Sequence, residues 1–356
     1  MELETTKKIK VFYFAPENSG VAFYRFYQPL EDLKERGFIE LRSWGFDFTE
    51  KIFDFPSIKE LKEIADWGDI FIFGRRDVKE YFFAIQAIKE FSQKPVLLDI
   101  DDNIFDISPY LAARVGYNPN GEAIKIHEAI TKYVDGIVVS TPFLDELYRK
   151  YNKNIKIVPN GVKNVFIPKS HEGINIGYLV SGSHLENSKI IEGAILRILR
   201  KYSNVKFYYT KAFSGFMDFI PQEIEKQVNF LPWLPLKNYL NYVNNLGLDI
   251  GLAPLMDNYF NRAKSNIRVL EYWQNRMAVI ATPLDEYNKT ITHGFDGYLS
   301  QDDEWEHWLE DLIQHPDRRR YLMQNSLQTL KNYDISIFAD KYYNIIREII
   351  NGAHTR

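Results

Sequence analysis

Short apolar segments alternate with helical patterns along most of the chain, and this alternation limits the possible folds more than any other feature. Strands that are buried on both faces read as nearly continuous apolar runs, and strands that alternate with amphipathic helices are typical of parallel sheets. The sequence therefore predicts an α/β protein whose parallel sheets are covered by helices. In the first half, strands are predicted at 10–15, 39–44, 69–73, 96–100 and 135–141, and helices at 22–36, 57–65, 78–91, 122–133 and up to about Tyr151.

The second half repeats this order, so the sequence predicts two domains. A chain of 356 residues exceeds the usual size of a single core, and domains of roughly 150–200 residues are expected. We predict Rossmann-like domains at 1–160 and 174–334, joined by a linker at 161–173. Further strands are predicted at 175–179, 249–255 and 278–283, and further helices up to about Lys201 and at 265–276, 303–314, 317–332 and 335–350.

Composition limits the class of partner and the compartment. The formal net charge of −4 argues against a general nucleic-acid binder, because such binding depends on Lys and Arg neutralising phosphates. With no cysteine, neither disulfides nor thiolate metal sites are possible. The first residues are acidic and lack a signal-peptide pattern, and no window approaches the ~18 apolar residues of a membrane span. We expect a cytoplasmic protein, and a peripheral contact with the inner face of the membrane stays open.

The stretch from Asp249 to Tyr298 contains the clearest candidate for a ligand site. A helix that follows a parallel strand points its first backbone N–H groups and its positive dipole end to the edge of the sheet where ligands bind. Two cations and three small polar residues stand where such a helix begins, and they suit a diphosphate. Glu271, one turn further in, could accept two hydroxyls of a ribose. Together these features predict a nucleotide ligand, and the residues at the helix start are Asn261, Arg262, Lys264, Ser265 and Asn266.

Five segments in this stretch resemble the donor-binding half of GT-B glycosyltransferases, in particular those of family 4. The segments are 249–254, 260–266, 270–272, 279–283 and 294–299, and 155–162 resembles the end of the first domain in the same family. The resemblance covers almost the whole chain. It implies two Rossmann-like domains that face each other across a cleft, and a last helix, 335–356, that crosses back to the first domain.

The resemblance also implies an activity. Such an enzyme transfers a sugar from a nucleotide-diphosphate-sugar donor to a hydroxyl of a glycan or lipid-linked acceptor, with retention of configuration and without a metal or other cofactor. Synthesis of bacterial surface polysaccharides or glycoconjugates is the expected setting. Closure of the cleft would exclude water, and Lys264, Arg262 and the helix amides would stabilise the leaving diphosphate.

Further donor contacts follow from matched positions. The loop with Ser183 and His184 resembles a Gly-Ser-x-Thr-His segment of one family branch, but the Thr is missing. The Arg and Lys that many members place on the donor phosphates have no clear counterpart, and Lys189 is only a loose candidate. Trp233 stands where the family holds the nucleobase, so it would either stack on the base or form a surface or interdomain contact.

The central motif of the family is only half present. It consists of a Glu near the donor sugar and, after seven residues, a Glu on the ribose. Glu271 matches the second, but the first position is occupied by Ala263. The sugar contact of retaining enzymes would then be absent or supplied by Asn261 or Arg262.

An acidic cluster closes the strand 96–100, and three interpretations of it stay open. Asp101 and Asp102 fall where many family members carry a His-Asp pair, and they could orient or deprotonate the acceptor hydroxyl. Alternatively, the spacing of Asp99 and Asp101 could bind Mg²⁺, or the cluster could cap the following segment.

Acceptor contacts are expected from the same side of the first domain. The long irregular loop at 103–121 contains Tyr110 and Arg114, and long loops in compact domains are often functional. Arg25, an acceptor-side candidate, lies one turn into the helix that follows Gly20, and Gly20, a candidate donor contact, would let the backbone approach a ligand; a surface salt bridge and an ordinary tight turn are the alternatives. His127, on an apolar helix face, is interpreted as a core residue.

Two rival functions remain. A nucleotide-sugar epimerase shares the fold and the diphosphate site, and it would form product without an acceptor. A non-catalytic homologue that binds a sugar nucleotide or glycan is favoured by Ala263 and would bind without turnover.

Overall fold

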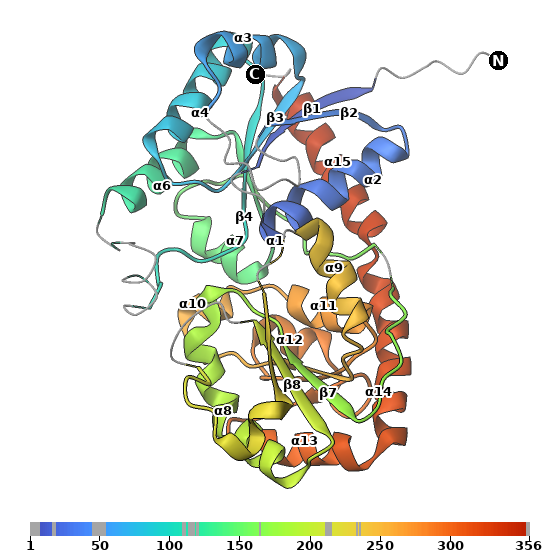
Figure 1. Ribbon diagram of the computed structural model, residues 1–356. Coiled ribbons are helices and arrows are strands. Elements are labelled where there is room, and N and C mark those ends of the chain that lie inside the picture. The colour runs from blue at the N-terminus through green and yellow to red at the C-terminus, as the bar shows by residue number, and fades with distance from the viewer. Residues whose placement is uncertain are drawn as a thin grey trace, which may run out of the picture. The chain divides into compact units, whose positions relative to one another are not determined.

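The computed structural model describes residues 8–15, 19–44, 55–108, 112, 118, 121–163, 165–210, 216–232, 234 and 236–353. Contacts between residues divide the chain into two units. The first consists of Met1–Gly161 and Ile335–Arg356, and the second of Val162–Asp334. Each unit contains one six-stranded sheet (Figure 1).

All neighbouring strands of the first sheet run parallel. The central strands are buried along their whole length, which requires cover on both faces and explains their continuous apolar sequences. The predicted bounds of two strands, 39–44 and 96–100, agree with the structure. In spatial order the strands are β2 (Ile39–Trp44), β1 (Ile9–Phe14), β3 (Ile70–Gly74), β4 (Val96–Ile100), β5 (Gly136–Val139) and β6 (Ile155–Ile157).

Two helices of the first unit, α3 and α7, begin with recognisable capping signals. Ser57 and Glu60 form a capping box at α3, and Thr141 caps α7, which has Pro142 in its first turn. The last helix, α15, packs along α2 (Figure 1). The described helices are α1 (Gly20–Ala22), the π-helical η1 (Phe23–Tyr27), α2 (Gln28–Glu35), α3 (Ile58–Trp67), α4 (Lys79–Ser92), α6 (Glu122–Tyr133), α7 (Pro142–Tyr148) and α15 (Ile335–Ala353).

The second sheet is also parallel throughout. Its chain order runs outward from β7 through β8 to β9 on one side, and from β10 through β11 to β12 on the other. In spatial order the strands are β12 (Tyr298–Leu299), β11 (Ala278–Ala281), β10 (Ile250–Ala253), β7 (Ile174–Tyr178), β8 (Val205–Thr210) and β9 (Val228–Leu231).

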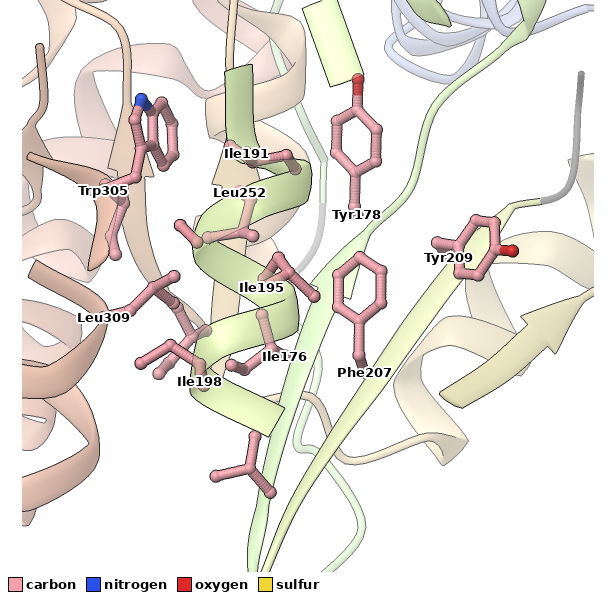
Figure 2. Packing of buried hydrophobic residues seen from close by; sticks show 14 of the residues in the cluster. Ile176, Tyr178, Ile191, Ile195, Ile198, Phe207, Tyr209, Leu252, Trp305 and Leu309 are labelled. Carbon is pink, nitrogen blue, oxygen red and sulfur yellow. The ribbon is translucent and has the colours of Figure 1, made fainter. Parts of the chain in front are cut away.

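One face of the second sheet carries a large hydrophobic core. Figure 2 shows Ile191, Ile195 and Ile198 of α8 beside sheet residues such as Phe207 and Leu252. Trp305 and Leu309 of α13 join the same cluster (Figure 2). The described helices of this unit are η2 (Gly182–His184), α8 (Leu185–Lys201), η3 (Gln222–Gln227), α9 (Leu236–Asn245), α10 (Tyr259–Arg262), α11 (Ile267–Gln274), α12 (Asp285–Thr290), α13 (Trp305–Gln314), α14 (Pro316–Thr329) and η4 (Leu330–Tyr333).

On the opposite face of this sheet, α11 approaches the backbone of β10 closely. A Cβ atom at Gly251 would lie 2.4 Å from the ring of Tyr272, so only glycine leaves room for this ring. The hydroxyl of Tyr272 donates to the backbone O of Leu252 at 3.0 Å and accepts from the backbone N of Leu179 at 3.1 Å. Gly251 therefore fixes where α11 begins relative to the ends of β7 and β10.

The α/β prediction is confirmed, with local corrections. The predicted helix 265–276 is shorter, since α11 begins at Ile267 and ends at Gln274, and the predicted loop 257–264 contains the short helix α10. Sequence patterns gave no prediction for β8, α9 or α12. None of the described helices is both long and apolar enough to span a bilayer.

Candidate functional site

The topology of the second unit points to one place at the edge of its sheet. Ligands of open parallel sheets bind beyond the carboxyl ends of the strands, where the chain order reverses direction. In this sheet the reversal falls between β7 and β10, which are neighbours. The loops that follow these two strands contain Ser183 and His184 on one side and Asn261 to Asn266 on the other. The structure thus brings most of the predicted donor-binding residues to the same edge.

A pair of buried asparagines ties these two loops together. The Nδ2 of Asn261 donates to the Oδ1 of Asn187 at 2.8 Å and to the backbone O of Met256 at 2.9 Å, and the Nδ2 of Asn187 donates to the Oδ1 of Asn261 at 3.3 Å. Asn187 also accepts from the backbone N of Met256 at 3.0 Å. Both amide hydrogens of Asn261 are used inside the protein, so its side chain positions the loop rather than reaching outward as the sequence had suggested for a sugar contact.

Arg262 has a partner that the sequence did not reveal. Its guanidinium donates to both carboxylate oxygens of Asp257, at 2.6 and 2.7 Å, and its side chain is 40% exposed. Asp285 lies 3.9 Å away. The charge of Arg262 is therefore balanced at the surface, and its predicted role on the diphosphate stays a prediction that this arrangement does not favour.

Lys264 lies between α10 and α11, next to the start of the longer helix. Its Nζ is 4.4 Å from the centre of the Phe260 ring, a distance at which a cation and an aromatic face attract each other. Ser265 and Asn266, which follow it, are buried. The side chain of Asn266 bonds to Thr290 at 2.9 Å and does not cap the first turn of α11. Lys264 is thus the predicted cation that stands closest to the helix start.

Glu271 is buried beside Arg268, a residue that sequence reasoning missed. The Nη1 of Arg268 donates to the Oε2 of Glu271 at 2.5 Å, and the two side chains are only 18% and 11% exposed. Burial opposes the charge of Arg268, but Glu271 and nearby tyrosines outweigh it, and the net effect raises the pKa of Arg268. The signal that could have found this residue is its spacing, because residues three apart share one helix face.

The burial of His184 and the positive charges near it affect the pKa of its imidazole. Its own desolvation, followed by Lys264 and Arg268, lowers the pKa of His184 well below the usual value, so the imidazole is neutral at physiological pH. Its Nδ1 lies 3.2 Å from the Nδ2 of Asn187, an amide that can only donate. The proton of the neutral ring is therefore assigned to Nε2. Ser183, one residue earlier, contacts the hydroxyl of Ser181 at 3.2 Å.

In the first unit, Asp101 and Asp102 directly follow β4 at the carboxyl edge of the sheet, and both are partly buried. The turn after them is held by Asn103, whose Oδ1 accepts from the backbone N of Phe105 and whose Nδ2 donates to Asp106, each at 2.9 Å. Asn103 thus stabilises the turn that follows the acidic cluster. The predicted role of Asp101 and Asp102 at the acceptor hydroxyl stays a prediction.

Arg25 forms a buried network with Asp99. Its Nε and Nη2 donate to the two carboxylate oxygens of Asp99 at 2.8 and 2.9 Å, and its Nη1 donates to the Oδ1 of Asn160 at 3.0 Å. Tyr342 of α15 also donates to Asp99, at 3.1 Å. With a side chain 1% exposed, Arg25 has the salt bridge given as an alternative, buried rather than on the surface, and it is not positioned to touch an acceptor directly. Because Arg25 holds both oxygens of Asp99, Asp99 and Asp101 do not present two open carboxylates to Mg²⁺.

Other predicted residues have mixed outcomes. Gly20 is exposed in the first turn of α1, and a Cβ there would meet nothing within 4 Å, so a larger residue would fit and the predicted ligand contact of Gly20 stays a prediction. His127 is confirmed as a core residue, because it is fully buried and its ring nitrogens contact Asp77 and the hydroxyl of Tyr148, each at 2.8 Å. Three residues for which ligand contacts were predicted, Trp233, Tyr110 and Arg114, lie outside the described residues.

Comparison with known proteins identifies the fold. No protein-family model and no curated protein matches the sequence. Sucrose-phosphate synthase from Thermosynechococcus elongatus matches with a TM-score of 0.68 and 10% identity over 97% of this chain and 100% of that chain. Anabaena HepE, solved with UDP-glucose, gives a TM-score of 0.65 and 11% identity over 96% of this chain and 100% of that chain. The pneumococcal O-GlcNAc transferase GtfA, solved with UDP and GlcNAc, gives a TM-score of 0.57 and 13% identity over 82% of this chain and 59% of that chain.

These similarities place the chain in a structural class. Its two parallel α/β sheets have the GT-B fold, the fold of glycosyltransferases such as the three proteins above. The predicted fold is thereby confirmed.

Proposed function

We propose that the protein is a glycosyltransferase that uses a nucleotide-diphosphate sugar as donor and a hydroxyl of a glycan or lipid-linked molecule as acceptor. The observation that carries the proposal is the grouping of Lys264, Arg268 and Glu271 at the start of α11, beside the strand reversal of the second sheet. Cations near helix amides suit a diphosphate, and a buried carboxylate suits a ribose diol. The fold supports the same class, since HepE was solved with UDP-glucose.

The reaction assigns separate tasks to the two units. An acceptor oxygen bonds to the anomeric carbon of the donor sugar while the bond from that carbon to the diphosphate oxygen breaks. Lys264 and the amides of α11 stabilise the negative charge that develops on the leaving diphosphate. Asp101 and Asp102 orient or deprotonate the acceptor hydroxyl. A retained configuration and a role in surface polysaccharide or glycoconjugate synthesis belong to the proposal.

One observation favours a non-catalytic alternative. Ala263, at the position of the family's first Glu, is fully buried and brings no polar group to the donor sugar. A homologue that only binds a sugar nucleotide would keep the site around Lys264 and Glu271 and lose turnover. Incubation with a nucleotide sugar and candidate acceptors separates the cases: transfer supports the enzyme, product without acceptor supports an epimerase, and binding alone supports the non-catalytic homologue.

The first test is thermal unfolding with UDP, GDP, ADP, CMP and dTDP. A ligand that binds only the folded state, at 100 times its dissociation constant, stabilises by about 2.7 kcal/mol, or about 5–10 °C for a unit of this size. We expect one nucleoside diphosphate to raise the midpoint and Lys264→Ala to remove most of the rise. The control is Lys206→Ala, which changes an exposed lysine on β8.

The outcomes are distinct. A rise that Lys206→Ala preserves and Lys264→Ala abolishes supports the donor site. If none of the nucleotides moves the wild-type midpoint, the donor-site proposal is wrong. If both variants keep the full rise, a nucleotide binds but Lys264 is not its cation.

A further inference from the structure

An open groove on the first unit lies between the first turns of α3 and α4, two helices that pack side by side (Figure 1). Its volume is about 290 Å³, close to the lower end of the range of ligand pockets, roughly 300–1,000 Å³. Such pockets are lined mainly by apolar side chains with a few polar groups among them. The apolar walls of this groove are formed by Phe55, Pro56, Leu61, Phe83 and Ala84.

Two large apolar side chains at this place are left in water. Phe83 is 51% exposed although it lines the groove, and Ile58, the first residue of α3, is 61% exposed. The core contacts of α4 are made by other residues, such as Ile85 and Ile88, which are fully buried. Exposed apolar residues that adjoin an apolar groove indicate a binding surface, whereas scattered ones do not. An apolar ligand in the groove would remove Phe83 from water.

The groove lies at the edge of the sheet where the acceptor is proposed to react. Because α4 follows β3, its first turns stand at the carboxyl edge of the sheet. The strands β3 and β4 are neighbours, with Gly74 opposite Asp99. Asp101 and Asp102 therefore leave the sheet beside the segment 75–78 that leads into α4. A molecule in the groove can present its other end to these two carboxylates.

Two cations accompany the apolar walls. The guanidinium carbon of Arg76 lies 5.0 Å from the centre of the Phe55 ring, and this ring is part of the lining. Lys79, in the first turn of α4, lines the groove itself. Phosphate oxygens accept charge-assisted hydrogen bonds from Arg and Lys, and such bonds are stronger than those between neutral groups. The groove thus combines walls for an apolar chain with cations for a phosphate.

Three carboxylates near these cations leave room for an anion. Asp77 contacts the buried His127 at 2.8 Å and is itself only 7% exposed, so its charge is directed into the protein. Glu122 pairs with Lys79 at 2.6 Å, but both side chains are exposed, and surface pairs of this kind are weak. Glu80 also lines the groove and repels an anion there, which leaves the position beside the two cations for a phosphate.

We propose that the groove between α3 and α4 holds the apolar chain of a lipid-linked acceptor whose sugar is joined to that chain through a phosphate. The proposal rests on the proposed function and narrows its acceptor, a glycan or a lipid-linked molecule, to the second class. The chain contacts Phe83 and the other apolar walls, and the phosphate contacts Arg76 and Lys79. The sugar extends along the sheet edge toward Asp101 and Asp102. Burial of apolar surface supplies the affinity, and the cations select the phosphate.

The test uses three probes that separate the chain from the charge: decyl phosphate, inorganic phosphate and decyl maltoside. Dissociation constants are measured by calorimetry below the critical micelle concentrations. We expect the wild type to bind decyl phosphate at least about 10-fold more tightly than either other probe, because inorganic phosphate lacks the chain and decyl maltoside lacks the charge. UDP should not compete with decyl phosphate, since the proposed donor site lies in the second unit.

Two variants test the two parts of the groove. Phe83→Ser should weaken decyl phosphate and decyl maltoside roughly 5- to 10-fold and leave inorganic phosphate unchanged. Arg76→Met should weaken decyl phosphate roughly 10-fold and leave decyl maltoside unchanged. The matched controls are Phe91→Ser, which changes a 39% exposed residue at the other end of the same helix, and Arg149→Met, which changes an exposed arginine after α7.

Several results would overturn the proposal. The groove is not a lipid site if decyl phosphate binds no better than inorganic phosphate, if Phe83→Ser acts like Phe91→Ser, or if UDP displaces the probe. Equal binding of decyl phosphate and decyl maltoside removes the phosphate from the proposal, and this comparison needs only the wild type if Arg76→Met does not fold. A dimer in sedimentation that Phe83→Ser abolishes assigns the groove to a second copy of the chain.

Failure of this inference and failure of the proposed function give different results. If a nucleoside diphosphate binds and decyl phosphate does not, the glycosyltransferase proposal stands and the lipid-linked acceptor is wrong. If decyl phosphate binds and none of the nucleotides does, the proposed function is wrong, and the role of the groove in holding an acceptor is lost with it.

Discussion

The buried pair of Arg25 and Asp99 gives the sharpest prediction about stability. Four donor contacts of one guanidinium join the π-helical turn η1 to Asp99 at the end of β4, and to the backbone O of Val158 and the side chain of Asn160 after β6. In Arg25→Met the carboxylate of Asp99 stays buried without its cation. Removing one partner of a buried ion pair costs roughly 3–5 kcal/mol, which lowers the unfolding midpoint of a domain of about 150–250 residues by about 6–20 °C.

The defect should depend on pH in a definite direction. Burial raises the pKa of Asp99 above its usual value, against the opposing effect of Arg25. Without Arg25, the pKa of Asp99 in the folded state rises further. A carboxyl group whose pKa is higher in the folded state binds its proton more tightly there, so it costs no stability below the unfolded pKa and increasingly more as the pH rises through the folded pKa. The variant is therefore expected to lose most stability at neutral and alkaline pH and to recover in mild acid.

The assay is thermal or urea unfolding of the wild type, Arg25→Met and Arg25→Met combined with Asp99→Leu, at several pH values. The double variant should recover a large part of the loss and show no comparable pH dependence, since no buried charge remains. Lys79→Met is the control, because Lys79 pairs with Glu122 at the surface, where both side chains are exposed, and such pairs contribute roughly 0–1 kcal/mol. The reasoning is refuted if Arg25→Met costs no more than Lys79→Met, or if the defect grows in acid.

Two further predictions concern packing and chemistry. Gly251→Ala should destabilise the second unit by roughly 1–3 kcal/mol in urea unfolding, because the added Cβ would lie 2.4 Å from the Tyr272 ring, whereas Gly20→Ala should be nearly neutral; equal effects would contradict the packing argument. Asp101→Asn should lower the rate of sugar transfer roughly 100- to 10,000-fold in a steady-state assay while the dissociation constant of the donor nucleotide is unchanged. An unaltered rate, as expected for the exposed control Asp66→Asn, would remove Asp101 from the chemistry.

Much of the fold followed from local patterns. Strands such as 39–44 and 96–100 and the helix 122–133 were predicted with the bounds that the structure has, because buried parallel strands and amphipathic helices impose different apolar periods. The elements without a prediction had weaker signals. In β8, exposed Lys206 interrupts the apolar residues, and α12 is too short to show a helical period, as is α10 within the predicted loop 257–264.

The candidate site was predictable as a place but not as a set of contacts. The strand-to-helix order brought Lys264 and Glu271 to the sheet edge, as expected from the positions of loops in parallel sheets. The sequence could not show that Asp257 neutralises Arg262, since the path of the segment from the loop after β10 into the short helix α10 depends on tertiary packing. The sequence also gave no sign that Arg268, unlike other arginines in predicted helices, contacts Glu271.

What the sequence determined by itself was the order of strands and helices, the parallel α/β class and the sheet edge that carries the candidate site. These depend on periodicity and chain direction, which are local properties. Tertiary structure alone decided which charges meet. Arg25 reaches Asp99 across 74 positions of sequence, and Asn261 reaches Asn187 across 74 as well. The interaction of two charges depends on their distance and on the exclusion of water around them. Neither the buried partner of Arg25 nor the residues around Glu271 could therefore be predicted from the sequence alone.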